Sequence, residues 1–291
     1  MKIKDSLKGA LLVVAAGMGW GTSGTLQALM PEGASSLTVG SARIFFAGLL
    51  LLIWVFFKGW RSVFNASWSW KGVFIAALGL TLYQFAFFSA VRLTGVAVGT
   101  MVTIGSAPAL AGLLGALWFK EKLSRRWFIA TPLAVAGCVL LVLAGNANIE
   151  NVSVTGAVLA LCAALAYAAE GVGLRIVGDG HDALDTTSLI TILSGLMAMP
   201  CLIVGDVSWM AVPRGALCVL LLACVTTIIP YTLFAAGVRR VTLGRAYTLS
   251  LSEPLTACLL SVFLLGERLT LLGIAGVVCI FAGIVLLAGD N

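Results

Sequence analysis

Three charged residues lie inside apolar stretches of the sequence, at positions where a charge in a membrane needs a partner or a cavity. Glu253 stands directly before Pro254, and Glu170 and Arg43 occupy two other apolar stretches. A carboxylate at such depth could take up and release a proton, or receive the ammonium group of a ligand. Arg43 could attract a ligand carboxylate. These three residues are therefore candidates for binding or coupling.

Each of the three also has a purely structural interpretation. Glu170 could form an ion pair with Arg175 or Arg245, which we expect on the same side of the membrane. Glu253 could belong to a buried pair between the two halves of the chain, and Arg43 could bond to carbonyl groups of loops or helix ends. Sequence alone leaves both interpretations open.

Aromatic and amide side chains at similar depth form a second group. Its members are Trp20, Tyr83, Gln84, Phe87, Tyr167, Tyr231 and Tyr247. Together they predict an amphipathic pocket with aromatic walls, which suits a small zwitterion or an organic amphiphile better than a phosphate ester. The alternative is that they only pack helices or anchor the membrane interface.

No catalytic or metal-binding set is recognisable. The one histidine, His181, lies in the loop GDGHDALDT, where we expect contact with water. The seven cysteines lack CxxC or CxxH spacing, which favours packing over a metal site. Without HExxH, paired carboxylates or a GxxxxGK[ST] loop, we expect no enzyme, no cofactor and no direct use of ATP.

Transmembrane helices are the elements that must position these residues. The chain is 60% hydrophobic and 10% charged, with a mean hydropathy of +1.09, which no soluble chain of 291 residues could cover with polar surface. Apolar blocks of about 20 residues, enough to cross a hydrocarbon core of about 30 Å, follow one another. We predict an all-α integral membrane protein with one membrane domain, 1–291, and spans at about 9–30, 36–57, 72–91, 95–118, 127–145, 155–177, 187–205, 214–238, 244–265 and 270–289.

The charges between these spans predict the topology. With a cytoplasmic N-terminus, most lysines and arginines fall in inside segments, and the outside segments hold Arg92, Arg214 and Arg268. The positive-inside rule therefore places both termini in the cytoplasm. Because the basic residues lie at helix ends rather than in one patch, we expect no nucleic acid partner.

The two halves of the chain resemble each other. The stretch GSAPALAGLLGALWFKEKLS at 105–124 aligns with LSEPLTACLLSVFLLGERLT at 251–270, which pairs Glu121 with Glu267. We expect each of these two glutamates to pair locally with the basic residue that follows it. The alignment predicts two five-helix repeats, 1–147 and 148–291, and because five is odd, the second repeat is inverted in the membrane.

Several of these segments together resemble a known family. APALAGLLGALWFKEKLS, EPLTACLLSVFLLGERLT, SARIFFAGL and PYTLFAAGVRRVTLGRAYTLSLSEP resemble the EamA-type transporters of the drug/metabolite transporter superfamily, over essentially the whole chain. The resemblance implies a secondary carrier with a central cavity. It also implies that the first, third, fourth, sixth, eighth and ninth helices line this cavity, with the fifth and tenth at the periphery.

From the pocket and the resemblance, we predict a secondary transporter that exports small organic solutes, foremost amino acids including aromatic ones, by alternating access. The alternative is an exporter of drugs or organic cations. We expect a small-molecule substrate and membrane lipid as partners, and a multi-pass location in the bacterial inner membrane. GxxxG motifs at Gly17/Gly21 and Gly95/Gly99 permit close helix approach but do not decide between a monomer and a homodimer.

Overall fold

The computed structural model describes residues 3–64, 67–144, 153–178, 180–265 and 270–288, and these ranges contain helices but no strand. The first half of the chain forms α1 (Ile3–Gly21), α2 (Ser23–Ala28), α3 (Ser36–Phe64), α4 (Trp70–Phe119) and α5 (Arg125–Ala144). The second half forms α6 (Val154–Val177), α7 (Ala183–Val204), η1 (Ser208–Ala211), α8 (Pro213–Ala223), the π-helical turn η2 (Cys224–Ile228), α9 (Ile229–Val238), α10 (Leu243–Leu249), α11 (Ser252–Leu265) and α12 (Leu271–Ala288).

Ten helical stretches in the described part of the chain are long and apolar enough to cross a membrane. This confirms the predicted all-α membrane fold with ten spans. The seventh span begins earlier than predicted, at Ala183 rather than 187. The reason is local: the Asp182 carboxylate accepts a hydrogen bond from the Leu184 N–H at 2.8 Å and caps the helix there.

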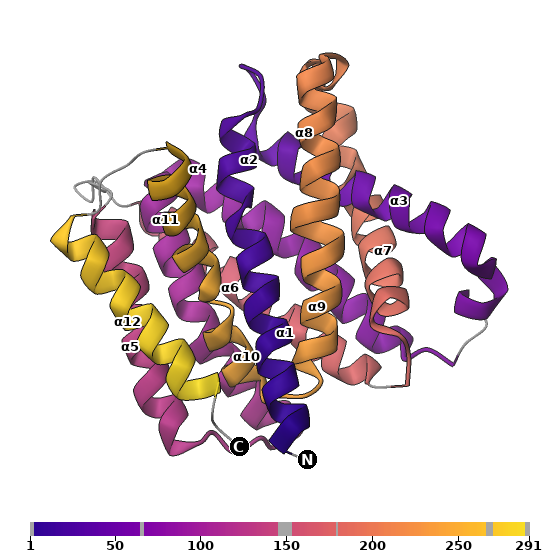
Figure 1. Cartoon of the computed structure of the whole chain (residues 1–291). Coiled ribbons are helices and arrows are strands. Elements are labelled where there is room, and N and C mark those ends of the chain that lie inside the picture. The colour runs from indigo at the N-terminus through magenta and orange to yellow at the C-terminus, as the bar shows by residue number, and fades with distance from the viewer. Residues whose placement is uncertain (1–2, 65–66, 145–152, 179, 266–269, 289–291) are drawn as a thin grey trace.

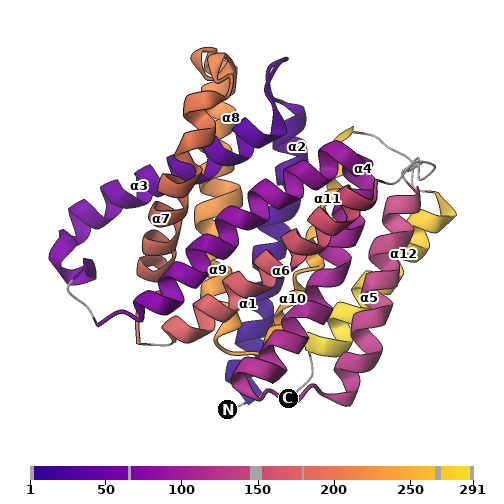
Figure 2. The same cartoon turned by 180° about the vertical axis from the view of Figure 1, so that it is seen from behind.

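The third and fourth spans belong to one long element, α4, which bends sharply at Gly95. Gly95 has φ 81° and ψ 157°, a conformation that only glycine adopts without strain. Its backbone lets the chain change direction within one residue, and the two halves of α4 diverge from this point (Figure 2). Gly95 of the second GxxxG motif therefore forms a bend rather than a helix contact.

Two spans depart from a regular α-helix partway along their length. The eighth passes from α8 to α9 through η2, and the ninth breaks between α10 and α11 at Ser250 and Leu251. Breaks within a span free backbone groups that must be satisfied within the protein. The Ser250 hydroxyl does this by donating to the carbonyl of Tyr247 at 2.9 Å. Interrupted helices of this kind surround binding sites in many transporters.

Glycines bring two helix pairs into close contact. A Cβ atom built on Gly137 of α5 would lie 2.7 Å from the carbonyl oxygen of Gly276 on α12, and these two helices run side by side in both views (Figures 1 and 2). A Cβ atom on Gly21 of α1 would lie 2.6 Å from the carbonyl oxygen of Glu253 on α11, and Gly17 packs against the same helix. The first GxxxG motif thus serves packing within the chain.

The start of α1 and the end of α12 lie at the same end of the bundle, which we call the terminal end; the opposite end is the far end (Figure 1). Helix ends and short loops at the terminal end carry most of the basic residues: Lys4, Lys8, Lys58, Arg61, Lys71, Lys120, Lys122, Arg125, Arg126, Arg175, Arg239 and Arg240. At the far end, the described basic residues are Arg92 and Arg214.

Candidate functional site

A cavity of about 510 Å³ lies between helices of both halves of the chain. Trp20, Tyr167 and Tyr231 line it in the middle of the bundle, whereas Gln27 and Ala144 line it near the far end. None of its described lining residues lies at the terminal end. The cavity therefore extends from mid-membrane depth to the far end only.

The helices that line this cavity differ in part from those that the resemblance implied. The fifth helix was expected at the periphery, but its last turns contribute Cys138, Leu141 and Ala144 to the wall. Gly273 of α12 and Arg43 of α3 line it as well. Toward the far end, the cavity reaches past the inner helices to the α5–α12 pair, which explains why these nominally outer helices take part.

Aromatic rings form the inner end of the cavity. The ring centroids of Trp20 and Tyr231 lie 5.2 Å apart, and those of Trp20 and Tyr167 lie 6.1 Å apart, both edge to face. Tyr83 lies 5.3 Å from Tyr167 and stacks on Phe87 at 5.5 Å. The structure thus brings together these five residues, which come from four separate spans, at the distances that favour aromatic pairs.

Tyr247 does not line the cavity, in contrast to its predicted place in the pocket. It is fully buried beneath Tyr167, with ring centroids 4.5 Å apart. Its hydroxyl donates to the carbonyl oxygen of Tyr167 at 2.5 Å and accepts from the N–H of Gly171 at 3.1 Å. The reason is that Tyr247 lies on the face of α10 that packs against α6, so its role is to support the aromatic layer.

The three charged candidates separate into two groups. Arg43 and Glu253 line the cavity, whereas Glu170 is buried outside it, with an exposed fraction of 1%. The expected partners of Glu170 are engaged elsewhere: Arg175 pairs with Glu121, and Arg245 bonds to the Ser6 hydroxyl at 2.7 Å. Neither ion-pair interpretation of Glu170 therefore holds, because tertiary packing carries both arginines toward other groups.

Three side-chain atoms that face this region are buried and make no hydrogen bond within the described residues. They are Trp20 Nε1, Arg43 Nε and Gln84 Nε2, and their three residues all line the cavity. Arg43 thus lacks the carbonyl partners expected for a structural arginine. Buried polar groups are nearly always paired in proteins, so an unpaired cluster at a cavity wall is a strong indication of a ligand site.

At the terminal end, the bundle is closed by a polar network around Glu121. The Glu121 carboxylate pairs with Arg175 Nη2 at 2.7 Å and accepts from the Leu243 N–H at 2.8 Å. Arg175 Nη1 also donates to the carbonyl groups of Val238, at 2.9 Å, and Val241. The expected local pairing of Glu121 with Lys122 is therefore wrong: Glu121 reaches the other half of the chain. Its counterpart Glu267 lies outside the described residues.

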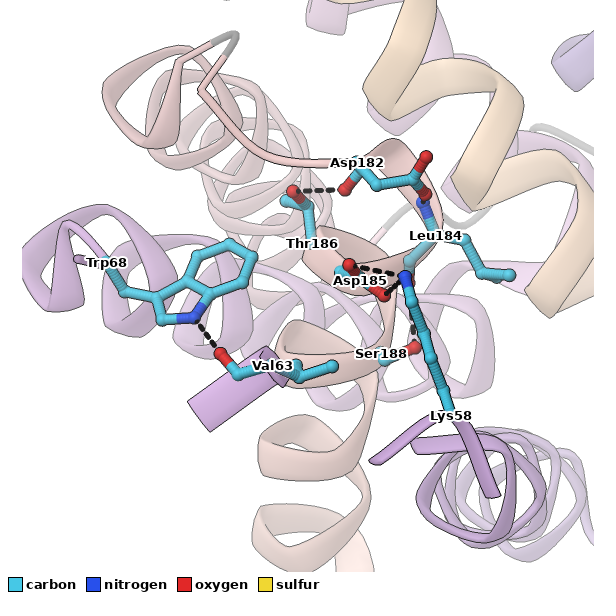
Figure 3. A network of polar contacts seen from close by, with 8 residues as sticks. All are labelled: Lys58, Val63, Trp68, Asp182, Leu184, Asp185, Thr186 and Ser188. Carbon is cyan, nitrogen blue, oxygen red and sulfur yellow. Dashed lines mark hydrogen bonds and ion pairs between the residues drawn. The ribbon is translucent and has the colours of Figure 1, made fainter. Parts of the chain in front are cut away.

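A second network joins α3 to α7 at the same end (Figure 3). The Lys58 ammonium pairs with Asp185 at 2.7 Å. Nearby, the Trp68 indole N–H donates to the carbonyl of Val63 at 2.5 Å, and the indole stacks on His181 with ring centroids 3.7 Å apart. His181 is therefore partly covered by an aromatic ring, and is not simply a solvated loop residue.

Some cavity residues were missed in the sequence. Ser23 and Gln27 of α2 line the cavity, and Cys138 and Cys258, interpreted there as packing residues, line it too. Ser23 and Gln27 are four residues apart and hence on one helix face. This i, i+4 pair of polar residues, close to Trp20 in the sequence, is the pattern that could have predicted that α2 lines the cavity.

The amino-acid sequence matches the EamA-like transporter family twice, over residues 7–143 and 154–289. The chain belongs to the EamA-like transporter family. The two matches cover the two halves of the chain in turn, so this EamA protein contains two family repeats. It is a multi-pass membrane transporter and not an enzyme.

Relatives of this EamA protein agree with that assignment. The chain is 37% identical over 281 residues to the uncharacterized transporter YwfM of Bacillus subtilis, covering 96% of this chain and 93% of that protein. It is 28% identical over 219 residues to a "probable amino-acid metabolite efflux pump" of Salmonella typhimurium, covering 71% and 73% of the two chains. One protein of known crystal structure aligns with a TM-score of 0.81 at 19% identity, over 96% of this chain and 95% of that one, which supports the fold alone.

Proposed function

We propose that this EamA transporter exports amino acids, aromatic ones included, across the bacterial inner membrane by alternating access. The observation that carries the proposal is the cavity itself: its inner end consists of Trp20, Tyr83, Phe87, Tyr167 and Tyr231, and its wall also carries two charged residues, Arg43 and Glu253. Such a surface suits a small amphiphile with an apolar or aromatic side chain. The name of the Salmonella relative points to the same substrate class.

The orientation follows from the distribution of charge. The excess of lysine and arginine at the terminal end favours a cytoplasmic location for that end, with both termini inside. The cavity then faces the outside of the cell, and the Glu121 network closes the inside. In this arrangement, the structure corresponds to an outward-facing state from which a substrate would leave.

Alternating access requires the terminal end to open and the far end to close. We assign the two five-helix repeats to 1–147 and 148–291, inverted relative to each other, and the bonds of Glu121 cross from the first repeat to the second. Rocking of one repeat against the other would break these bonds and expose the aromatic layer to the cytoplasm. The glycine-lined contacts of α1 with α11 could slide during this motion because they lack bulky side chains.

Export of an organic cation is the second candidate, and one observation favours it. Glu253 faces a cavity with five aromatic residues at its inner end, an arrangement that also attracts cations. Arg43 lines the same cavity and weighs against it, because a guanidinium repels a cationic ligand.

Transport by purified protein in proteoliposomes tests the proposal. We expect uptake of labelled amino acids, strongest for apolar and aromatic ones, measured with and without an imposed proton gradient, and no uptake by protein-free vesicles. Transport of a lipophilic cation with no flux of any of the amino acids would assign the protein to the second candidate function.

A further inference from the structure

The cavity wall carries a cluster of hydrogen-bond donors that have nothing to bind within the described part of the chain. Trp20 Nε1, Arg43 Nε and Gln84 Nε2 are all buried and unpaired, and the exposed fractions of these residues are 6%, 9% and 3%. An indole and a guanidinium only donate hydrogen bonds, and the Gln84 amide nitrogen does the same. A ligand group that pairs with these donors is an acceptor, and beside a guanidinium an anion is favoured.

The protein itself does not supply that anion. Two ion pairs, Lys58–Asp185 and Arg175–Glu121, lie at the terminal end, and Arg43 takes part in neither. Glu253 and Glu170 are near enough to interact electrostatically with Arg43, but they do not form an ion pair with it. Leaving a buried guanidinium unpaired costs free energy, which a bound carboxylate would recover.

Glu253 provides the opposite charge on another wall of the same cavity. It is the one carboxylate among the described lining residues, and it stands at the start of α11, after the break in the ninth span. Its backbone N–H donates to the Ser250 carbonyl at 2.9 Å, which holds the residue at the break. The side chain is half-buried and faces the cavity, where it can accept hydrogen bonds from an ammonium group.

The two charges belong to different halves of the chain. Trp20, Arg43 and Gln84 come from α1, α3 and α4 of the first repeat, whereas Glu253 comes from α11 of the second. Tyr83 and Tyr167 lie in ring contact at 5.3 Å on the floor between the repeats. A ligand with both charges would therefore touch both repeats at once.

We infer that the cavity binds zwitterionic α-amino acids, with the substrate carboxylate at Arg43, Gln84 and Trp20 and the substrate ammonium at Glu253. The inference rests on the proposed function and narrows it: both charged groups of the substrate are required. An amine without the carboxylate cannot bind Arg43 and leaves the guanidinium unpaired. An acid without the ammonium group cannot pair with Glu253, and its carboxylate is repelled by that residue's like charge.

Three ligands with the same aromatic ring separate these contributions: phenylalanine, phenethylamine, which lacks the carboxylate, and 3-phenylpropionate, which lacks the ammonium. Displacement of tritiated phenylalanine from the purified wild-type protein is measured for each. We expect the amine and the acid to compete roughly tenfold to hundredfold more weakly than phenylalanine, the range given by loss of a hydrogen bond to a charged group. This comparison needs no variant.

Two variants then assign each charge. We expect Arg43→Gln to weaken phenylalanine binding about tenfold or more while leaving phenethylamine unchanged or bound more tightly, because the amine has no carboxylate to lose. We expect Glu253→Gln to weaken phenylalanine by a similar factor and to leave 3-phenylpropionate unchanged or bound more tightly. Arg92→Gln and Glu32→Gln, at exposed positions outside the cavity, are matched controls that should behave as wild type.

The outcomes distinguish the inference from the function on which it rests. If wild-type protein binds phenylalanine but binds the amine or the acid equally well, the charge assignment is overturned and amino acid transport stands. The same holds if both variants weaken all three ligands alike. If the wild-type protein binds no amino acid of a full panel, the proposed function itself is overturned.

Discussion

Arg175 of α6 and Glu121 at the end of α4 form an ion pair of 2.7 Å that joins the two halves of the chain. Because Glu121 also accepts the Leu243 N–H, and Arg175 also donates to the Val238 and Val241 carbonyls, one pair ties α4, α6, α9 and α10 together. Both side chains are largely shielded from solvent, with 22% of Arg175 and 6% of Glu121 exposed. The pair is therefore the contact whose loss should most favour opening of the terminal end.

We expect Glu121→Gln to shift the protein toward a state open at the terminal end. The substitution removes the charge of a partly buried pair, which weakens the closed end by about 1–3 kcal/mol. Cys258, which is half-buried and lines the cavity, reports the change if the other cysteines are replaced. Its reaction with a membrane-impermeant thiol reagent added from the far end should slow severalfold in the variant. An unchanged rate would mean that this pair does not hold the outward-facing state.

Loss of the Lys58–Asp185 pair should have a smaller effect. This pair also joins the two halves at the terminal end, but 35% of the Lys58 side chain is exposed (Figure 3). Exposed pairs contribute about 0–1 kcal/mol. In the same labelling experiment, we expect Asp185→Asn to change the rate of Cys258 modification less than Glu121→Gln does. The reverse order would identify the α3–α7 contact as the main closure.

Tyr247→Phe should lower stability because a buried hydroxyl and its hydrogen bonds are lost. The Tyr247 hydroxyl donates to the Tyr167 carbonyl and accepts from the Gly171 N–H, and a hydrogen bond contributes about 0.5–1.5 kcal/mol net. Thermal unfolding of the detergent-purified variant should occur at a lower temperature than in wild type. Tyr231→Phe is the matched control. Tyr231 faces the cavity, so this variant should unfold at the same temperature as wild type. Equal unfolding temperatures for the two variants would contradict a stabilising role for the Tyr247 hydroxyl.

Gly137→Ala should destabilise the contact of α5 with α12. The added methyl group would lie 2.7 Å from the Gly276 carbonyl oxygen, so the two helices would have to separate, at a cost of about 1–3 kcal/mol. At Gly105 of α4, the nearest atom would lie at an ordinary 3.6 Å, and Gly105→Ala should leave stability unchanged or slightly raised. Similar unfolding temperatures for both variants would contradict the tight packing at Gly137.

Trp20→Phe should weaken substrate binding while the protein remains folded. Phenylalanine keeps an aromatic ring against Tyr231 and Phe234, whose centroids lie 5.2 and 5.3 Å from that of Trp20, but it has no N–H donor. We expect phenylalanine affinity to fall about threefold to tenfold, the range for one net hydrogen bond. Trp118→Phe, at a position with an exposed fraction of 54% away from the cavity, is the control. If Trp20→Phe bound phenylalanine with wild-type affinity, the indole N–H would not contribute to substrate binding.

The ten spans could be predicted from the sequence because their length and apolarity follow directly from membrane thickness. The interruptions could be predicted only in part. Pro254 lacks the N–H that would bond the carbonyl of Ser250, one turn earlier, and the ninth span does break at Ser250 and Leu251. The contacts that complete this break, from the Ser250 hydroxyl to the Tyr247 carbonyl and from the Gly171 N–H to the Tyr247 hydroxyl, were not predictable. Such a break depends on contacts with other helices, which a single sequence does not contain.

The candidate site shows the same division. The position of a residue along its span was enough to predict that Trp20, Tyr83, Tyr167 and Tyr231 line one cavity. It was not enough to predict that Tyr247 lies outside that cavity. Depth gives the level of a residue in the membrane and leaves its direction around the helix undetermined. The partner of Glu121 was unpredictable for a related reason: a helix-end charge has local neighbours in the sequence, and its partner Arg175 is brought close only by tertiary packing.

Counterflow in proteoliposomes tests the central claim most directly. Vesicles containing the purified protein are loaded with unlabelled phenylalanine and diluted into a trace of labelled phenylalanine, so that only exchange through one binding site concentrates the label. We predict transient accumulation above the equilibrium level, absent from protein-free vesicles and strongly reduced by Arg43→Gln and Glu253→Gln. No accumulation with phenylalanine or any other amino acid, from protein that accumulates a lipophilic cation, would contradict amino acid transport by this cavity.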